Sequence, residues 1–408
     1  MLSILYPETA PHLQALPVGL LPFRHTQTGK LVLAIKATKE MILAAQMNQG
    51  FKFYVVPLAS TIGTVPALVT AFFDDADEPL ILMTPLFDDE MPRDVRELLA
   101  YEELEVYFLD EHNREWMSYR VRLQDGGSCF VDGTDLTFVP YSHNAMTLIY
   151  KGLEHWFGRR TPEDDARAVT VSFVESIGPD DLFIQDHTDT GNDYLGGAGY
   201  SNSMLTRENP GPFHERDLVA GLRRVFTGDK IAINPMRKDT GRELADILVL
   251  ASSHVLLVQA KDCPNTEEIL AGSLGRKRRV ARHQLEKGMR QAKGAVAHVL
   301  SYDQLDLVVG ECDLHVTIGS RILFSIVVIK EIFADEGDLY VSSCRRMAAD
   351  GVRGVVLDYP SLDLFTHRLR DENELVVALE EYRAILLKDG SFVNPQSFVL
   401  NWLAASSD

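Results

Sequence analysis

The sequence predicts an α/β protein with more than one domain, and three observations support this. The chain has 408 residues, 46% hydrophobic and 24% charged, an ordinary globular composition but too long for one typical domain. Short apolar runs of strand type alternate with amphipathic helical segments over most of its length. Residues 159–213 are rich in Asp, Thr, Gly, Asn and Ser, which indicates an irregular linker between two folded parts.

The N-terminal part, residues 1–158, is expected to be an α/β or α+β domain. The elements that predict it are the strand-like runs 31–35, 53–56, 80–83 and 104–108 and the helical segments 39–47 and 93–103. The acidic clusters at 74–78 and 88–90 are expected to be exposed loops rather than metal ligands. No motif in this part indicates an activity.

The second domain is expected at residues 214–390, followed by a C-terminal tail at 391–408. Its predicted elements are a helix at 214–226, strands at 246–250 and 255–261, a helix at 276–300, strands at 321–330 and 354–359, and two closing helices. Asp371 begins a sequence typical of a helix start, which places the last of these helices over residues 375–387.

Charge and targeting signals narrow the class of protein. The net charge is −19, yet residues 201–300 carry an excess of Lys and Arg, so an anionic partner is expected to bind there. The N-terminus lacks the features of a signal peptide, and no apolar run reaches the length of a membrane span. We therefore expect a soluble, cytoplasmic protein without a membrane partner. The four cysteines are widely spaced and are expected to be buried thiols.

Three polar side chains end the two apolar strands of the second domain. Asp246 precedes the first strand, and Gln259 and Lys261 close the second, after a break at residues 251–254. If this break is a tight turn, Asp246 lies opposite Gln259, with Cβ atoms roughly 5 Å apart. Lys261 points to the same face because strand side chains alternate. Buried strands rarely end in such a group unless the polar atoms share a ligand.

Oxygen atoms dominate this group, which favours Mg²⁺ or Mn²⁺. Asp246 would supply a carboxylate, Gln259 an amide oxygen and Ala260 a backbone carbonyl. Lys261 would hold an attacking water or offset charge on a phosphate. Such a metal site can hydrolyse a phosphodiester, since the ion lowers the pKa of bound water.

Glu215 on the first helix, Asp246, and the run Gln259-Ala260-Lys261 resemble the PD-(D/E)XK nuclease superfamily. The likeness is to the variant in which Gln replaces the second acid, as in Mrr-like restriction endonucleases. The segment from Gln284 to Gln291 is similar to the Gln-bearing helix of the RecB-like and Mrr-like branches. The resemblance covers roughly residues 205–390.

This resemblance implies a restriction-endonuclease-like domain, a mixed sheet flanked by helices. It implies that Asp246, Gln259 and Glu215 bind the metal, that Lys261 assists the water, and that Gln291 faces the active site. The sequence departs from the family pattern at Ala245, where Pro is usual. Gln259 also removes one negative charge, which should weaken metal binding unless Glu215 offsets it.

The helix at 276–300 is strongly basic, which indicates phosphate binding. Its candidate nucleic-acid contacts are Arg276, Lys277, Arg278, Arg279, Arg282, Lys287 and Arg290. The alternative is a basic face packed against the acidic first half.

Structural alternatives exist for the site residues as well. Asp246 and Lys261 would form a buried ion pair, and Glu215 would interact with the first turn of its own helix. Glu243 and Asp262 are expected to face away from the site by strand alternation.

The function that these patterns predict is a Mg²⁺-dependent nuclease cleaving DNA, such as a restriction or phage-defence endonuclease. The alternatives are an RNA nuclease and a non-catalytic module that binds nucleic acid or protein on a nuclease-like fold. Cleavage of both strands would favour a homodimer. Residues 1–158 would then serve regulation or a protein partner.

Overall fold

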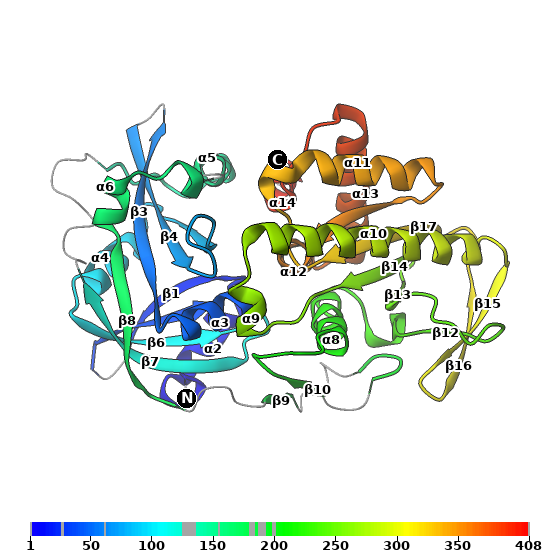
Figure 1. The fold of residues 1–408 in the computed structure, drawn as a ribbon, viewed down its shortest axis with the longest axis horizontal. Helices are drawn as coiled ribbons and strands as arrows, with labels where there is room; N and C mark the ends of the chain where they lie inside the picture. The colour runs from blue at the N-terminus through cyan, green and yellow to red at the C-terminus, as the bar shows by residue number, and fades with distance from the viewer. Residues whose placement is uncertain are drawn as a thin grey trace.

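The computed structural model describes residues 2–25, 28–60, 63–124, 136–153, 156–178, 184–186, 193–197 and 201–406. It contains two α/β halves side by side, each built on its own sheet (Figure 1). The predicted α/β class is confirmed. Within these residues, no helix combines the length and apolarity that crossing a membrane requires.

The N-terminal half is built on an eight-stranded sheet. In spatial order its strands are β1 (Gly19–Arg24), β2 (Leu31–Lys36), β6 (Glu103–Leu109), β7 (Glu115–Gln124), β8 (Val169–Ser176), β3 (Gly50–Ser60), β4 (Gly63–Phe72) and β5 (Leu80–Pro85). Neighbouring strands are antiparallel except β2 and β6, which are parallel. The helices of this half are α1 (Leu2–Leu5), α2 (Ala10–Ala15), α3 (Lys39–Met47), α4 (Met91–Leu99), α5 (His143–Leu153) and α6 (Pro162–Arg167).

Strand β2 is continuously apolar in sequence because both of its faces are buried. Leu33 and Ile35 belong to the core that also contains residues of α3 and α4. Val32 and Ala34 point to the other face, in a smaller core with Leu13 of α2. A strand buried on both faces has no solvent-facing positions to alternate with, so an unbroken apolar run results.

The predicted linker contains a strand of the N-terminal sheet. β8 lies between β7 and β3, and Val169 and Val171 are buried. The N-terminal half therefore extends past residue 158, to at least Ser176, and the linker is shorter than expected. The run at 169–173 is of strand type in the sequence, but its sheet could not be predicted, because the partners of β8 are distant in the chain. The remaining linker includes the two-stranded ribbon of β9 (Ile184–Asp186) and β10 (Ser201–Ser203), while residues 179–183, 187–192 and 198–200 lie outside the described ranges.

The C-terminal half is built on a mixed five-stranded sheet. Its strands in order are β11 (Ile231–Ile233), β13 (Ile247–Leu250), β14 (His254–Lys261), β17 (Ile322–Ile329) and β18 (Gly354–Asp358). β11, β13 and β14 are antiparallel, whereas β14, β17 and β18 are parallel. The helices of this half are α8 (Gly211–Leu222), α9 (Glu267–Leu270), α10 (Leu274–Val299), α11 (Gly337–Ala349), α12 (Tyr359–Arg368), α13 (Glu372–Asp389) and α14 (Pro395–Ser406).

Helix α10 crosses one face of this sheet, and α8 lies on the opposite side (Figure 1). Gly288 allows the close approach of α10, because a Cβ there would lie 2.6 Å from Val327 and 3.2 Å from Lys261. The predicted N-terminal cap of the last long helix is confirmed, since Asp371 accepts hydrogen bonds from the backbone of Asn373 and Glu374.

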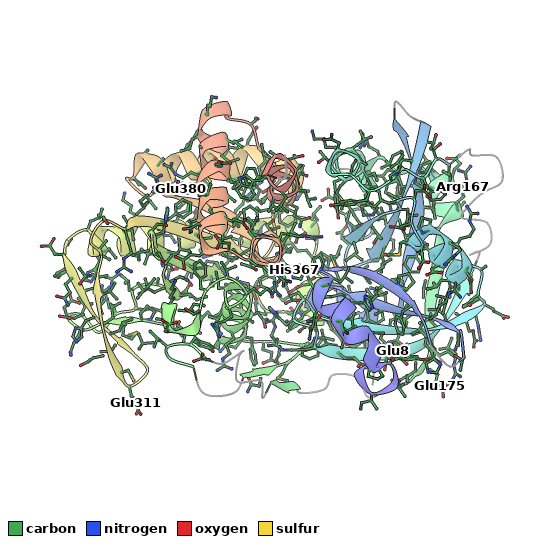
Figure 2. All side chains as sticks on the ribbon, turned by 180° about the vertical axis from the view of Figure 1, so that it is seen from behind. Glu8, Arg167, Glu175, Glu311, His367 and Glu380 are labelled. Atoms are coloured by element: carbon green, nitrogen blue, oxygen red, sulfur yellow. The ribbon has the colours of Figure 1, made fainter. Side chains whose placement is uncertain are left out.

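A three-stranded sheet was not expected from the sequence. It consists of β12 (Met236–Arg237), β15 (Gln304–Val309) and β16 (Cys312–Thr317), and the β15–β16 hairpin projects from the molecule with Glu311 at its tip (Figure 2). Short 3₁₀ turns occur at Pro7–Thr9, Phe157–Arg159, Gly228–Lys230 and Ala334–Glu336.

The segment predicted as a C-terminal tail is largely helical. α14 packs against α5 of the N-terminal half, and Thr147 donates a 2.7 Å hydrogen bond to Asn401. His367 of α12 also lies where the halves meet (Figure 2), with its Nε2 3.0 Å from the carbonyl oxygen of Ala15. The two halves are thus joined by helix packing at the end of the chain.

The cysteines follow the prediction only in part. Cys344 is buried, Cys263 is half-buried and Cys312 is exposed. The expectation of a buried thiol is wrong for Cys312, which lies at the start of the second strand of a projecting hairpin. Cys129 lies outside the described residues.

Candidate functional site

The polar ends of β13 and β14 meet in the predicted register. Ile247 pairs with Val258 and Leu250 with Val255, so the turn between the strands is tight. Continued by one residue, this register sets Asp246 opposite Gln259. The predicted register of the hairpin is therefore confirmed.

Asp246 binds the end of the neighbouring strand directly. Its Oδ2 accepts a 2.6 Å hydrogen bond from the backbone N–H of Ala260 and a 2.5 Å bond from the Lys261 ammonium. The Lys261 Nζ also donates to the carbonyl oxygen of Ala260 at 2.7 Å. Asp246 and Lys261 are 7% and 5% exposed, so the ion pair named as an alternative does form.

Gln259 lies on the same face of the sheet as Lys261. It pairs with Val327 of β17, and both Val327 and Lys261 face Gly288 of α10. The Gln259 side chain is buried. Its place on the same face as Lys261 agrees with the sequence prediction.

Glu215 approaches this pair from α8. The helix begins at Gly211 with Pro210 as its N-cap, so Glu215 lies beyond the residues that cap the first turn. Its Oε2 accepts a 3.1 Å hydrogen bond from the side chain of Asn234. The capping alternative therefore does not explain Glu215.

Asn234 links the helix to the strand, a role that the sequence did not reveal. Its backbone N–H donates to the carbonyl oxygen of Asp246 at 2.9 Å, while its amide binds Glu215. Its φ is 49°, the left-handed region that few residues other than Gly adopt. Such conformations concentrate at functional sites. The Asn234-Pro235 pair was the available signal, since Asn before Pro favours a turn.

The strand-end residues include more acidic groups than basic ones. Burial raises the pKa of Glu215 to about 7; the bond from Asn234 acts in the opposite direction, and the charges of Asp246 and Glu243 add to the increase. Burial and Asp246 also raise the pKa of Glu243. Strand alternation does not apply to Glu243, because β13 begins only at Ile247. Glu243 is exposed, yet the charges of Asp246 and Lys261 act on it. We call Glu215, Glu243, Asp246, Gln259 and Lys261, with the Ala260 carbonyl, the strand-end site.

Gln291 does not join this site. It is exposed, whereas Gln284 is half-buried and lines a cavity with Lys261. Both glutamines flank the buried stripe of α10, formed by residues such as Leu285 and Ala292. Residues 262–264, after β14, line the same cavity as Gln284, whereas Gln291 does not line it.

Part of the basic helix is neutralised by acidic side chains. Lys277 binds Asp74 at 2.6 Å, so this acid is not the freely exposed residue that was predicted. Arg278 pairs with Glu78 and Asp335, and Arg282 with Glu336. Packing against the acidic first half, the alternative for this helix, thus holds for Lys277 and for one of the two Arg278 pairs, whereas Arg282 pairs within the C-terminal half. The cations that are exposed and form no ion pair with any described residue are Arg276, Arg279, Lys287 and Arg290.

A second charged cluster lies between the halves. Lys39 Nζ lies 3.2 Å from Asp110, 3.1 Å from Glu111 and 3.1 Å from Asp217. Asp217, on α8, also binds Arg114 at 2.9 Å and Arg207 at 3.3 Å. We call these residues, with His112, the interface network.

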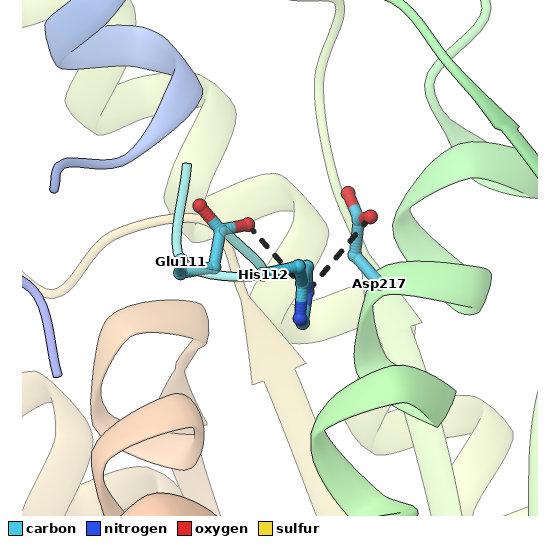
Figure 3. A group of neighbouring side chains, drawn as sticks. All are labelled: Glu111, His112 and Asp217. Atoms are coloured by element: carbon cyan, nitrogen blue, oxygen red, sulfur yellow. Dashed lines mark ion pairs between the residues drawn. The ribbon is translucent and has the colours of Figure 1, made fainter. Parts of the chain in front are cut away.

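Three members of the interface network could in principle ligate a metal (Figure 3). One donor atom each from Glu111, His112 and Asp217 lies within 4.8 Å of the others. Burial lowers the pKa of His112 to about 4, so it is neutral at pH 7. However, Lys39 and Arg114 already supply positive charge to these carboxylates, so the group fits a divalent cation poorly.

Comparisons of the chain with protein-family models, with curated proteins and with solved structures found no match. The strand-end site combines hard oxygen donors with one buried ammonium group, an arrangement suited to a divalent cation and a phosphate.

Proposed function

We propose that the chain is a Mg²⁺-dependent nuclease that hydrolyses DNA, with a C-terminal domain of the restriction-endonuclease-like PD-(D/E)XK type. The observation that carries this proposal is the convergence of Asp246, the Ala260 carbonyl and Lys261 at the adjoining ends of β13 and β14. The mixed sheet between α8 and α10 is consistent with that fold.

The donor set fits a hard divalent cation. The carboxylates of Glu215 and Asp246 and the carbonyl oxygen of Ala260 would hold Mg²⁺ or Mn²⁺, with the Gln259 amide oxygen as a further donor. Burial is the main cause of the raised pKa of Glu215, and the charges of Asp246 and Glu243 add to it, so a bound cation would favour the ionised carboxylate. When bound, the metal supplies a water of lowered pKa and polarises a phosphoryl oxygen.

Lys261 and the basic helix act on the substrate. The Lys261 ammonium is held in place by Asp246 and Ala260, so it can orient the attacking water or offset charge on the phosphate without reorganising. Arg276, Arg279, Lys287 and Arg290 are exposed for contact with other phosphates. To contact a phosphate, three further cations would first have to break their ion pairs with carboxylates: Lys277, Arg278 and Arg282.

The experiment is cleavage of plasmid DNA, single-stranded DNA and RNA by purified protein in Mg²⁺ or Mn²⁺. Lys261→Ala should lower the rate by about 10²- to 10³-fold, as loss of one preorganised donor does. Lys238→Ala is the matched control, because Lys238 is exposed directly after β12 and pairs with Asp313. Equal cleavage by Lys261→Ala, or no cleavage of any substrate, refutes the proposal. Salt-sensitive DNA binding that survives Asp246→Ala without cleavage would instead indicate a binding module.

A further inference from the structure

A cavity of about 200 Å³ begins at Lys261 and lies between the two halves. Its walls are mainly apolar. Ile269 of α9, Val280 and Ala281 of α10, and Phe333 after β17 come from the C-terminal half, and Leu80 from the N-terminal half. Because Lys261 both lines this space and binds Asp246, the cavity adjoins the strand-end site.

The size of the cavity limits its ligand to one small ring system. Its volume is below the range of about 300–1,000 Å³ that drug-sized ligands occupy. It is also several times the roughly 30 Å³ that one water molecule takes up in the liquid. A single nucleobase has two apolar faces and a polar edge, which suits walls that are largely apolar with a few polar groups.

Polar groups lie where a nucleotide would need them. Gln284 is half-buried in the cavity wall and offers an amide that can bond to the edge of a base. Arg276 also lines the cavity and is exposed, so it can meet a phosphate. These groups match a base inside the cavity, bonded to Gln284, and a phosphate at the exposed Arg276.

The N-terminal half restricts how a substrate can approach. Leu80 and Asp74 form part of the wall, and Asp74 is bound to Lys277 of α10. A stacked base pair cannot enter a space enclosed from both halves, whereas an unpaired base can. Extrusion of a base into a pocket is an established way for enzymes to reach nucleic acid.

We propose that this cavity receives one unpaired nucleobase of the substrate, so that the protein acts on single-stranded nucleic acid or on frayed ends. This inference rests on the proposed nuclease function and specifies its substrate class. The N-terminal half then contributes to substrate selection by closing the cavity over the base.

The first test is binding of 5′-deoxyadenosine monophosphate to the full chain by calorimetry, without a divalent metal. Wild type should bind the nucleotide at least 10-fold more tightly than inorganic phosphate. Ala281→Leu fills the cavity and should weaken nucleotide binding at least 10-fold. Ala297→Leu makes the same change on an exposed position of α10 and should have no effect. Val280→Phe is a second filling variant, and thermal unfolding verifies that each variant is folded.

The second test compares cleavage of a single-stranded oligonucleotide with that of a blunt duplex. Wild type should cut the single strand at least 10-fold faster, and Ala281→Leu should lose this preference. In one contrary outcome, the filling variants fold and still bind the nucleotide and cut as wild type does. That result would show that the cavity does not receive a base, while leaving the nuclease function intact. If no substrate is cut but nucleotide binding still depends on Ala281, the nuclease function fails and the base-binding cavity stands.

Discussion

The strand-end site and the interface network both join acids to one buried lysine, yet their charge balance differs. In the interface network, Asp110, Glu111 and Asp217 are matched by Lys39, Arg114 and Arg207. In the strand-end site, Lys261 pairs with Asp246, and it is the one cation whose charge offsets those of Glu215 and Glu243. Helix α8 carries one acid of each, Asp217 and Glu215, on positions two residues apart.

This difference separates a structural cluster from a functional one. Closely matched buried charges hold parts of a protein together but leave little attraction for a further ion. An excess of carboxylates beside one cation is costly without a partner and gains from a metal. The spacing of candidate ligands alone would have favoured the interface network, whereas the charge balance favours the strand-end site.

The largest expected effect is on stability, at the interface network. Asp217→Asn removes a buried carboxylate and leaves Lys39, Arg114 and Arg207 short of negative charge. Breaking such a buried pair costs about 3–5 kcal/mol. Denaturant unfolding should show this loss, whereas Asp229→Asn, an exposed acid on the turn after α8, should change stability little. If Asp217→Asn unfolds like wild type, the network does not hold the halves together.

The next effect concerns pH. Burial raises the pKa of Glu111 from 4.5 to about 7. Between these values the unfolded chain releases the proton while the folded chain retains it, so stability falls as pH rises from about 4.5 to 7. Glu111→Gln should make the decrease in unfolding free energy over this pH range smaller by up to about 3 kcal/mol.

The Glu111 effect is measured as unfolding free energy at several pH values. Glu311→Gln at the hairpin tip is the control, since that side chain is exposed. If unfolding free energy changes with pH equally in wild type and Glu111→Gln, Glu111 does not have the raised pKa.

Metal binding distinguishes the two clusters directly. Mn²⁺ at about 100 times its dissociation constant should stabilise wild type by about 2.7 kcal/mol. Asp246→Asn should abolish this increase, and Glu111→Gln should retain it. Thermal shift with and without Mn²⁺ provides the measurement. The reverse pattern, with the increase lost in Glu111→Gln, would place the metal in the interface network.

The smallest effect is expected at Asn234. Asn234→Gly keeps the left-handed backbone, which Gly adopts freely, and removes only the amide that binds Glu215. A hydrogen bond of this kind contributes about 1 kcal/mol. We expect about a fivefold higher Mg²⁺ concentration for half-maximal cleavage. Asn113→Gly is the matched control, because Asn113 also has a positive φ but lies in the β6–β7 turn. Equal metal requirements in both variants would show that Asn234 does not position Glu215.

Local sequence determined the hairpin that carries the strand-end site. Two apolar runs separated by four residues allow few pairings, because a shift of one residue would turn buried side chains to the other face. The positions of Asp246, Gln259 and Lys261 follow from that register. The long helices at 274–299 and 372–389 also matched their periodicity.

Only the tertiary structure decided which charged groups have partners. Asp74 and Lys277 are about 200 residues apart in the chain and bind at 2.6 Å, and β8 enters a sheet whose other strands end before residue 125. Glu243 joined the strand-end site and Gln291 did not, because neighbouring segments, rather than periodicity, set their surroundings. Register and helical pattern depend on nearby residues, whereas charge compensation depends on contacts between distant ones, which the sequence does not encode locally.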